Sequence, residues 1–326
     1  MKFPRLSILF PFRGSPYGGA NQFLHALRRS LEKKNLYAED TRDADAILFN
    51  SHHDLKAVFR EKKKFPNTPF IHRVDGPMGL YRNAPDKRDK LVMKANNAVA
   101  EGTVFQSQWS CNENIKFGWN EAGLSTVIGN APDPELFNKS NRTAMGGKVR
   151  LIAASWSSNP NKGFDVYEYL DKNLDFEKYE MVFCGNSPIK FSNIRSYAPV
   201  ESSELADYFK SSDIFITGSV NDPCSNTLIE ALHCGLPAIA RRSGGHPEIV
   251  GKGGELFDRA DEVPELIERF VDGFGRYQSN IHVPSIEEIK NSYVDFARSL
   301  LKEVNSGRIG LKNPGIMDRM WARFNG

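Results

Sequence analysis

Short apolar runs alternate with segments of helical periodicity along the whole chain. Short runs rich in β-branched and aromatic residues are typical of buried strands, whereas apolar positions three and four residues apart are typical of amphipathic helices. Strands that are separated by helices indicate βαβ units, which form parallel sheets covered by helices on both faces. The pattern therefore predicts an α/β fold.

The predicted strands fall into two series. Those of the first series are residues 6–10, 46–50, 69–74, 102–105 and 126–128. Those of the second series are residues 149–155, 179–184, 194–197, 214–217, 237–240 and 255–257. A polar, glycine-containing stretch at 140–148 separates the series and is typical of a linker. We therefore expect one domain over 1–145 and a second over 146–304.

Helices are indicated between the strands. Apolar residues recur at helical spacing over 19–34 and over 285–304. Ser225 or Asn226 is a suitable N-cap for a third helix, which Gly235 would end because glycine readily adopts the left-handed conformation found after a helix. These helices would lie on the faces of the two sheets.

The composition fits a folded globular protein: 40% of the 326 residues are hydrophobic and 25% are charged. No apolar run is long enough to cross a bilayer, and the run at 6–10 is cut short by Pro11 and Arg13, so we interpret it as a strand and not as a signal peptide. The four cysteines form no CxxC pair, which argues against a zinc site and a disulfide framework. A reducing cytoplasm is the expected location.

The net charge of +3 is unevenly distributed. Residues 1–145 hold 22 Lys and Arg against 15 Asp and Glu, a net of +7, and the remainder holds 21 against 25, a net of −4. Basic residues cluster at Arg28, Arg29, Lys33 and Lys34 and again at 62–64. Such clusters indicate either a solvated helix face or attraction to an anionic membrane surface or acidic acceptor. Nucleic-acid binding is not expected, because aromatic residues do not interleave with the basic ones.

Residues 219–250 hold the most informative pattern, SVNDPCSNTLIEALHCGLPAIARRSGGHPEIV. Asp222 follows a predicted strand, Glu230 lies in a predicted helix, and Gly244 and Gly245 follow the next strand. A carboxylate can accept hydrogen bonds from two ribose hydroxyls, and the backbone N–H groups of a glycine turn can bind phosphate. Taken singly, Glu230 also fits an ordinary surface helix and the two glycines a plain turn.

This segment resembles the donor-binding region of family 4 of the retaining GT-B glycosyltransferases. Seven residues separate Asp222 from Glu230, after which come Ala231, a Gly-Leu-Pro run at 235–237 and Gly-Gly-His-Pro-Glu at 244–248. The resemblance implies that Glu230 holds the ribose and that Asp222 contacts the donor sugar near the reacting bond. The family usually has Glu at the first position, so the shorter Asp222 implies a different donor sugar or a shifted geometry.

The resemblance extends into the first domain. Gly18 and Gly19 resemble an amino-terminal glycine loop whose backbone approaches donor phosphate or acceptor, although a helix-entry turn has the same pattern. His72 lies in a segment that resembles the one in which a histidine faces the sugar-transfer site, although a lone histidine is also often structural. The same segment contributes Arg73 and Asp75, which the resemblance places on the acceptor side.

Further matches lie in the second domain. Lys162 resembles the lysine that grips the diphosphate, and Gly244, Gly245 and His246 would contribute to donor binding. Ser157 stands where the family has an arginine, so one positive charge on the leaving group is missing or comes from elsewhere. The alternative sources of that charge are Arg13, Arg241 and Arg242.

As a whole, the resemblance implies a GT-B fold, in which two Rossmann-like parallel-sheet domains face a central cleft and residues 305–326 return to the first domain. It implies transfer of a hexose or pentose from a UDP- or GDP-sugar to a hydroxyl of a glycan, glycolipid or protein-linked acceptor, with retention of configuration. We expect no cofactor and no metal, because no DxD motif lies on a suitable loop. The expected location is the cytoplasm. An alternative is the cytoplasmic face of the membrane, which the basic first domain would contact.

Two other GT-B functions remain open: a protein that binds a nucleotide sugar without transferring it, and a nonhydrolysing nucleotide-sugar epimerase. Asp222 and Ser157, which depart from the family pattern, keep both alternatives open. A Rossmann dehydrogenase is not expected, because Gly14, Gly18 and Gly19 do not give the GxGxxG spacing.

Overall fold

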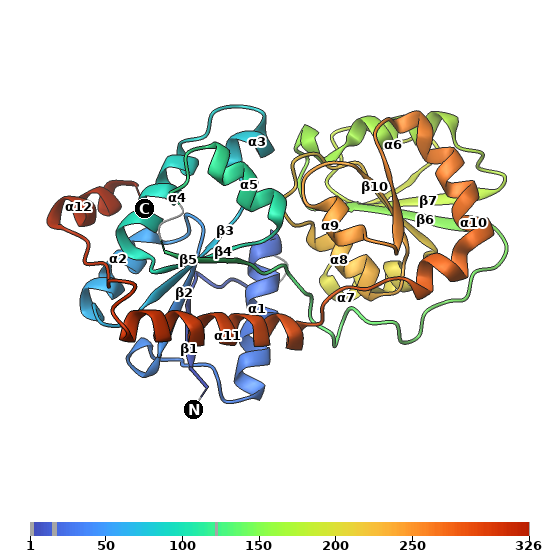
Figure 1. Ribbon diagram of the computed structural model, residues 1–326. Coiled ribbons are helices and arrows are strands. Elements are labelled where there is room, and N and C mark those ends of the chain that lie inside the picture. The colour runs from blue at the N-terminus through green and yellow to red at the C-terminus, as the bar shows by residue number, and fades with distance from the viewer. Residues whose placement is uncertain (1–2, 15–17, 121–122, 326) are drawn as a thin grey trace. The chain divides into compact units, whose positions relative to one another are not determined.

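The computed structural model describes residues 3–14, 18–120 and 123–325 (Figure 1). The chain divides into two compact units. The first consists of Met1–Arg13, Leu24–Gly129 and Ile286–Gly326, and the second of Gly14–Phe23 and Asn130–Ser285. The boundaries at 129/130 and 285/286 differ from the expected domain boundaries at 145/146 and 304/305. Phe137 packs in the core of the second unit, and the helix that starts at Ile286 packs on the sheet of the first.

The first unit contains a parallel sheet of five strands in the order β1-β2-β3-β4-β5. The strands are β1 (Leu6–Leu9), β2 (Ala46–Asn50), β3 (Phe70–Val74), β4 (Gly102–Phe105) and β5 (Leu124–Val127). All residues of β2, β3 and β4 are buried, as expected for strands that are covered on both faces.

Helices cover both faces of this sheet. They are α1 (Gly18–Lys33), α2 (Leu55–Lys64), α3 (Met78–Arg82), α4 (Lys87–Val99), α5 (Gln108–Lys116), α11 (Ile286–Asn305) and α12 (Ile316–Asn325). Val58 of α2 and Val99 of α4 share a core with Phe49 and Phe70 of the sheet. Helix α11 packs on the sheet so closely that a Cβ at Gly102 would lie 2.9 Å from Leu300.

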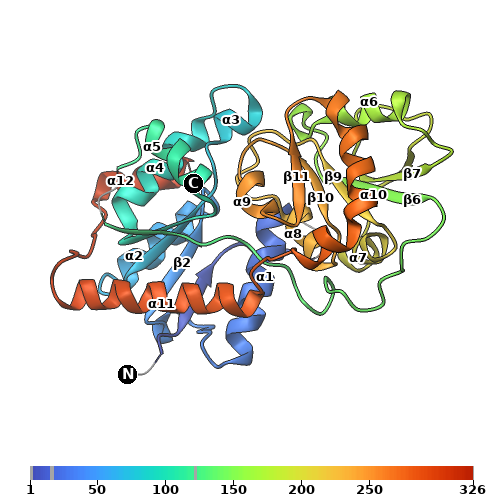
Figure 2. The same cartoon turned by 45° about the vertical axis from the view of Figure 1, so that its right-hand side comes forward.

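The second unit contains a parallel sheet of six strands in the order β11-β10-β9-β6-β7-β8 (Figure 2). The strands are β6 (Val149–Ser155), β7 (Tyr179–Gly185), β8 (Arg195–Tyr197), β9 (Ile214–Thr217), β10 (Ala238–Arg241) and β11 (Gly254–Phe257). The chain runs outward from β6 through β7 to β8, crosses back to place β9 beside β6, and runs outward again through β10 to β11. This is the doubly wound topology of dinucleotide-binding folds.

The helices of the second unit lie on opposite faces of its sheet. They are α6 (Phe164–Asn173), α7 (Ser202–Lys210), α8 (Asn226–His233), α9 (His246–Val250) and α10 (Val263–Ser279). One core joins α6 and α10 to the sheet, and a second joins α7 and α8 to its other face. Figure 2 shows the two layers.

The predicted α/β fold with two parallel sheets is confirmed. Every predicted strand is present, with ends that differ by at most two residues from those expected, as at β5. The helices predicted over 19–34 and 285–304 correspond to α1 and α11.

One interpretation of the basic clusters is wrong in part, because Lys62 is not on a solvated helix face. Its side chain is fully buried, and its Nζ lies 2.8 Å from Oε1 of the equally buried Glu101. Glu101 also accepts hydrogen bonds from the backbone N–H groups of Phe70, at 2.7 Å, and of Lys312, at 2.7 Å. Lys62 therefore belongs to a buried ion pair that joins α2, the start of β3 and the segment before α12.

Within the described ranges, none of the helices combines the length and the apolar character that a membrane span requires.

Candidate functional site

The second sheet has one topological switch point, between β6 and β9. These strands are parallel neighbours, with Ile152 paired to Phe215, and the connections that follow them lead to opposite sides of the sheet. In open α/β sheets, ligands bind outside the carboxyl ends of the strands at such a point, because the two connections diverge there. The loops at 156–163 and 218–225 are therefore the expected location of a ligand-binding site.

These two loops are in direct contact. Gly163 has a φ of 80°, and a Cβ at this position would lie 2.1 Å from the carbonyl carbon of Gly218. The backbone N–H of Val220 donates a hydrogen bond of 2.8 Å to the carbonyl of Asn161. Only glycine allows this approach, which fixes the loop after β6 against the loop after β9.

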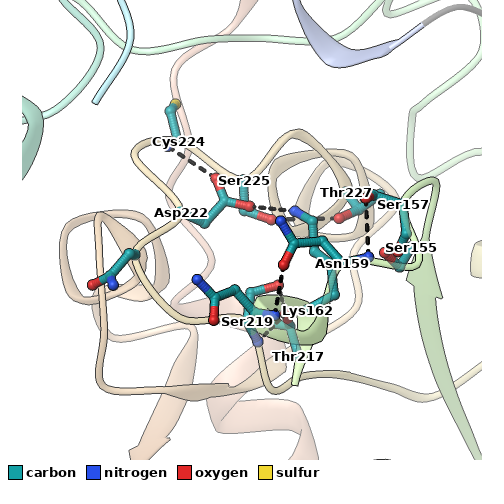
Figure 3. Close-up of polar contacts among 12 residues, drawn as sticks. Ser155, Ser157, Asn159, Lys162, Thr217, Ser219, Asp222, Cys224, Ser225 and Thr227 are labelled. Atoms are coloured by element: carbon teal, nitrogen blue, oxygen red, sulfur yellow. Dashed lines mark hydrogen bonds and ion pairs between the residues drawn. The ribbon is translucent and has the colours of Figure 1, made fainter. Parts of the chain in front are cut away.

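Lys162 and Asp222 meet where these loops touch (Figure 3). Nζ of Lys162 lies 2.8 Å from Oδ2 of Asp222, and the two side chains are only 19% and 11% exposed. The other carboxylate oxygen accepts a hydrogen bond of 3.2 Å from the backbone N–H of Cys224. Burial acts to raise the pKa of Asp222, but the charge and hydrogen bond of Lys162 and the N–H of Cys224 help to hold this pKa below its ordinary value. The site thus presents an ionised carboxylate beside an ammonium group.

The Gly244-Gly245 turn holds the Asp222 loop. The N–H of Gly245 donates a hydrogen bond of 2.9 Å to the carbonyl of Asp222. Gly244 has a φ of 62°, and a Cβ there would lie 2.2 Å from the same carbonyl oxygen. The N–H of Gly245 is therefore already engaged in this conformation, whereas the sequence suggested that it is free for a phosphate.

Ser157 brings no charge to the loop after β6. Its hydroxyl accepts a hydrogen bond of 3.1 Å from the N–H of Asn159 and helps to shape the turn before Lys162. Two arginines that are candidates to replace the family's arginine are engaged with carboxylates: Arg241 lies 2.5 Å from Asp165, and Arg242 lies 3.3 Å from Asp258. The third candidate, Arg13, lies in the first unit.

Glu230 is an unpaired buried carboxyl group. It is the fifth residue of α8 and is 9% exposed, so it is not the ordinary surface residue that the sequence alone allowed. Its side chain makes no hydrogen bond or ion pair with any residue that the structure describes. Burial raises its pKa to about 7. A buried carboxyl group without partners is costly, which favours a role in ligand binding over one in folding.

His246 does not expose a surface to a ligand. It is fully buried, and its Nδ1 donates a hydrogen bond of 2.9 Å to the carbonyl of Arg241. Burial lowers its pKa, against the opposing effects of Asp222 and the Arg241 carbonyl, so the ring is neutral near pH 7. Its Nε2 is buried and makes no hydrogen bond with any residue that the structure describes.

Gly19 reveals a residue that the sequence did not single out. Residues 14–23 belong to the second unit, and a Cβ at Gly19 would lie 2.0 Å from Nδ2 of Asn226, the first residue of α8. The side-chain oxygen of Asn226 accepts a hydrogen bond of 2.9 Å from Nδ2 of Asn130. Gly18, with a φ of 65°, begins α1. The sequence indicates Asn226 only as a helix start, because a contact between distant segments has no local sequence signal.

The catalytic candidate His72 and the acceptor-side candidate Arg73 are both buried in the core of the first unit. His72 is fully buried, stacks on Phe49 with 4.1 Å between ring centroids, and has a hydrogen bond of 2.9 Å to the carbonyl of Ser51. Arg73 is also fully buried and donates a hydrogen bond of 2.5 Å to Oδ1 of Asn50. Neither can contact a ligand in this conformation, so the expected role of His72 at the sugar-transfer site is not supported.

Asp75 remains accessible. It follows β3, its side chain is 25% exposed, and its carboxylate lies 3.6 Å from Arg73 and accepts a hydrogen bond from Gln106. In the described part of the chain, no group of three or more His, Cys, Asp and Glu side chains gathers in a way that could hold a metal ion. Metal independence stays a prediction.

Comparisons with known proteins match part of the sequence and the fold. Residues 172–272 match the family model described as Glycosyl transferases group 1, and this range includes Asp222, Glu230 and the glycine turn. The sulfoquinovosyl transferase SQD2 of Arabidopsis thaliana is 34% identical over 194 residues, which cover 52% of this chain and 37% of that protein. The chain spans less than two fifths of the length of the curated relatives that it matches.

Solved structures resemble nearly the whole chain. Sucrose-phosphate synthase from Thermosynechococcus elongatus has a TM-score of 0.66 at 12% identity, covering 94% of this chain and 98% of that one. The Anabaena protein HepE in complex with UDP-glucose has a TM-score of 0.64 at 14% identity, covering 93% and 100%. The chain therefore has the two-domain GT-B fold of these structures, and its residues 172–272 match the glycosyl transferases group 1 model.

Proposed function

We propose that this protein transfers a sugar from a nucleotide-diphosphate donor to a hydroxyl acceptor, with retention of anomeric configuration and without a metal ion. The observation that carries the proposal is the Lys162–Asp222 pair at the switch point of the second sheet, inside or beside the segment that matches the glycosyltransferase family model. Doubly wound sheets bind nucleotides at this place. HepE, a structural neighbour, was solved in complex with UDP-glucose.

Each part of the donor has a candidate partner. Glu230 accepts hydrogen bonds from the two ribose hydroxyls, which offsets the cost of its burial. Lys162 binds the diphosphate; its ammonium group has three hydrogens and can keep Asp222 while it donates to a phosphate oxygen. Gly19 brings the start of α1 close to the start of α8, where backbone N–H groups favour an anion.

The chemistry requires that two developing charges are stabilised together. As the sugar leaves the diphosphate, negative charge grows on the leaving oxygen and positive charge on the sugar ring. Lys162 stabilises the first charge, and a well-placed donor in such a site contributes on the order of 3–4 kcal/mol. Asp222, held in its ionised form, orients the donor sugar and faces the second charge. The acceptor hydroxyl attacks from the face that the diphosphate leaves, and a phosphate oxygen takes its proton.

The ion pair also sets limits on the donor. A glutamate at position 222 would extend one methylene further towards the sugar, whereas Asp222 is held back by Lys162 and Cys224. The shorter carboxylate leaves room for a substituent on the sugar or for a bridging water molecule. We infer that the sugar differs in size or in the position of its hydroxyls from those that the family's usual glutamate contacts.

A panel of UDP-, GDP- and ADP-sugars tests the proposal. Protection against thermal unfolding identifies the donor, and release of free nucleotide in the presence of candidate glycan and glycolipid acceptors reports transfer. Proton NMR of the product gives the anomeric configuration, and activity that persists in EDTA supports metal independence. Stabilisation without release under any acceptor would assign the chain to nucleotide-sugar binding alone, and a donor converted to its epimer would assign it to the epimerases.

A further inference from the structure

Helix α12 packs on the first unit through only part of its surface. The Trp321 ring lies 6.0 Å from the Phe59 ring of α2, and Lys94 Nζ of α4 lies 4.4 Å from the centroid of the Trp321 ring. Ala322, one residue further on, is 1% exposed. These contacts attach α12, the red helix at the left of Figure 1, to α2 and α4.

Three large apolar side chains of α12 are exposed. Ile316, Met317 and Met320 are 69%, 83% and 53% exposed, and they are among the most exposed large hydrophobic side chains that the structure describes. Met320 is four residues from Ile316 and three from Met317, so its side chain adjoins both of the others along the helix. Single exposed hydrophobic residues are ordinary, but three large ones on one short helix mark an interaction surface.

The neighbouring face of α2 is basic. Lys56, Arg60 and Lys63 are exposed, and their spacing places them in one narrow stripe along the helix. Lys56 and Lys63 form no ion pair with any residue that the structure describes, whereas Arg60 and Lys64 share the carboxylate of Glu61. The two helices enclose a surface pocket of about 400 Å³, which is lined by the basic stripe together with Phe59, Ile316 and Met320.

We propose that α2 and α12 form a membrane-docking surface that binds the anionic phospholipid leaflet of a bilayer. An apolar face beside unpaired lysines is the arrangement of a helix that lies in the membrane interface, with its hydrophobic side chains among the acyl chains and its cations among the headgroups. The exposed methionines and isoleucine lose their contact with water, and Lys56 and Lys63 gain phosphate partners. The basic side chains of the pocket suit the phosphate of one lipid headgroup, and its apolar side chains suit the first part of the acyl chains.

This inference goes beyond the proposed function and does not depend on it, because all the residues involved belong to the first unit, whereas Lys162 and Asp222 belong to the second. It names which part of the basic first domain would meet a membrane. The basic residues of α1, which the sequence suggested equally, are less suited to this role, because Arg28 there is paired with Glu32 and Glu39.

Sedimentation of the full chain with lipid vesicles tests the proposal. We expect binding to vesicles of phosphatidylcholine with phosphatidylglycerol, little binding to phosphatidylcholine alone, and partial release at high salt, because the charged contacts are screened while the apolar ones remain. Equal binding to both vesicle types, or binding to neither, would overturn it. Nucleotide binding measured without vesicles reports the donor site separately.

Two sets of variants localise the surface. Lys56→Glu with Lys63→Glu, and Ile316→Ser with Met317→Ser and Met320→Ser, should each weaken binding to the anionic vesicles by about tenfold or more. The charge-matched control Lys178→Glu with Lys252→Glu, on the second unit, should bind like the wild type. Unchanged vesicle binding in both test sets contradicts the proposal. Wild-type self-association that the serine variant abolishes would assign the face to a second copy of the chain, and this too overturns it.

Discussion

Asp222 is held by groups from three separate segments. Lys162 comes from the loop after β6, Cys224 from the loop after β9 and Gly245 from the turn after β10. Both carboxylate oxygens and the backbone carbonyl of Asp222 are thereby fixed before any ligand arrives. A carboxylate that is oriented in advance has little reorganisation left to undergo during a reaction, which is the arrangement expected of a residue that faces developing charge.

Glu230 makes the stability of the ligand-free protein depend on pH. Its pKa is raised from 4.5 to about 7 by burial, so the folded state holds the proton more tightly than the unfolded state does. The stability that this proton contributes is therefore full below the unfolded pKa and is lost as the pH rises through about 7. We expect Glu230→Gln to be more stable than the wild type by on the order of 2–3 kcal/mol near pH 8 and equal to it near pH 4, as measured by urea denaturation.

The same substitution separates stability from binding. If Glu230 accepts hydrogen bonds from ribose hydroxyls, the more stable glutamine variant binds nucleotide less tightly, because its amide accepts at one oxygen only. If Glu230→Gln showed the same pH dependence of unfolding as the wild type, the pKa of Glu230 would not be raised. Its burial would then give no support for a role in ligand binding.

Gly244 packs directly against the backbone of Asp222, so a larger residue there would disturb the site. A Cβ there would lie 2.2 Å from the Asp222 carbonyl oxygen at a φ of 62°, so Gly244→Ala must displace the Asp222 loop. We expect a loss of stability of about 1–3 kcal/mol and at least roughly a hundredfold loss in kcat, measured by calorimetry and by nucleotide release. Gly146→Ala, which has open space around its Cβ, is the matched control and should leave both unchanged. Normal turnover in Gly244→Ala would show that the position of the Asp222 loop does not matter for the reaction.

At the scale of elements, the strands were predictable and the direction of their polar residues was not. The apolar runs located every strand because burial on both faces leaves little room for polar residues. For the same reason, nothing in the run at 69–74 shows whether its histidine faces a ligand or packs in the core. In the structure, His72 packs between Phe49 and α4. The alternation of faces along a strand becomes informative only when one face is solvated.

Lys62 presents the same difficulty on a helix. In the sequence it is one of three consecutive lysines, and only the position of Glu101, far along the chain, decides which of them points inwards. The Asp222 and Lys162 contact, by contrast, was within reach of sequence reasoning, because both residues follow strands whose carboxyl ends lie at the same edge of a sheet.

The buried Lys62–Glu101 pair should be costly to break. Lys62→Met leaves the Glu101 carboxylate buried with only its two backbone donors, and we expect the free energy of unfolding to fall by about 3–5 kcal/mol. The double variant Lys62→Met with Glu101→Gln removes the unpaired charge and should recover part of this loss. Lys63→Met, on the exposed neighbour, should change stability by about 0.5 kcal/mol or less in the same urea titration. Equal effects at positions 62 and 63 would contradict the pairing.

At the scale of the whole molecule, the proposed donor site depends on the topology of the second sheet. The doubly wound second sheet provides a switch point, and the loops at that point bring Lys162 and Asp222 to 2.8 Å from each other. Proteins with one fold often act on different substrates, so the GT-B fold alone does not identify a donor or an acceptor. The proposed chemistry therefore rests on the groups at the ends of β6, β9 and β10.

Isothermal titration of UDP, GDP and ADP into the wild type and three variants tests the central claim most directly. We expect one of these nucleotides to bind, Lys162→Ala and Glu230→Ala each to weaken its binding by about tenfold or more, and the control Lys178→Ala to bind it like the wild type. If no nucleotide binds, or if both site variants bind it as tightly as the wild type does, then the switch point of the second sheet is not the donor site.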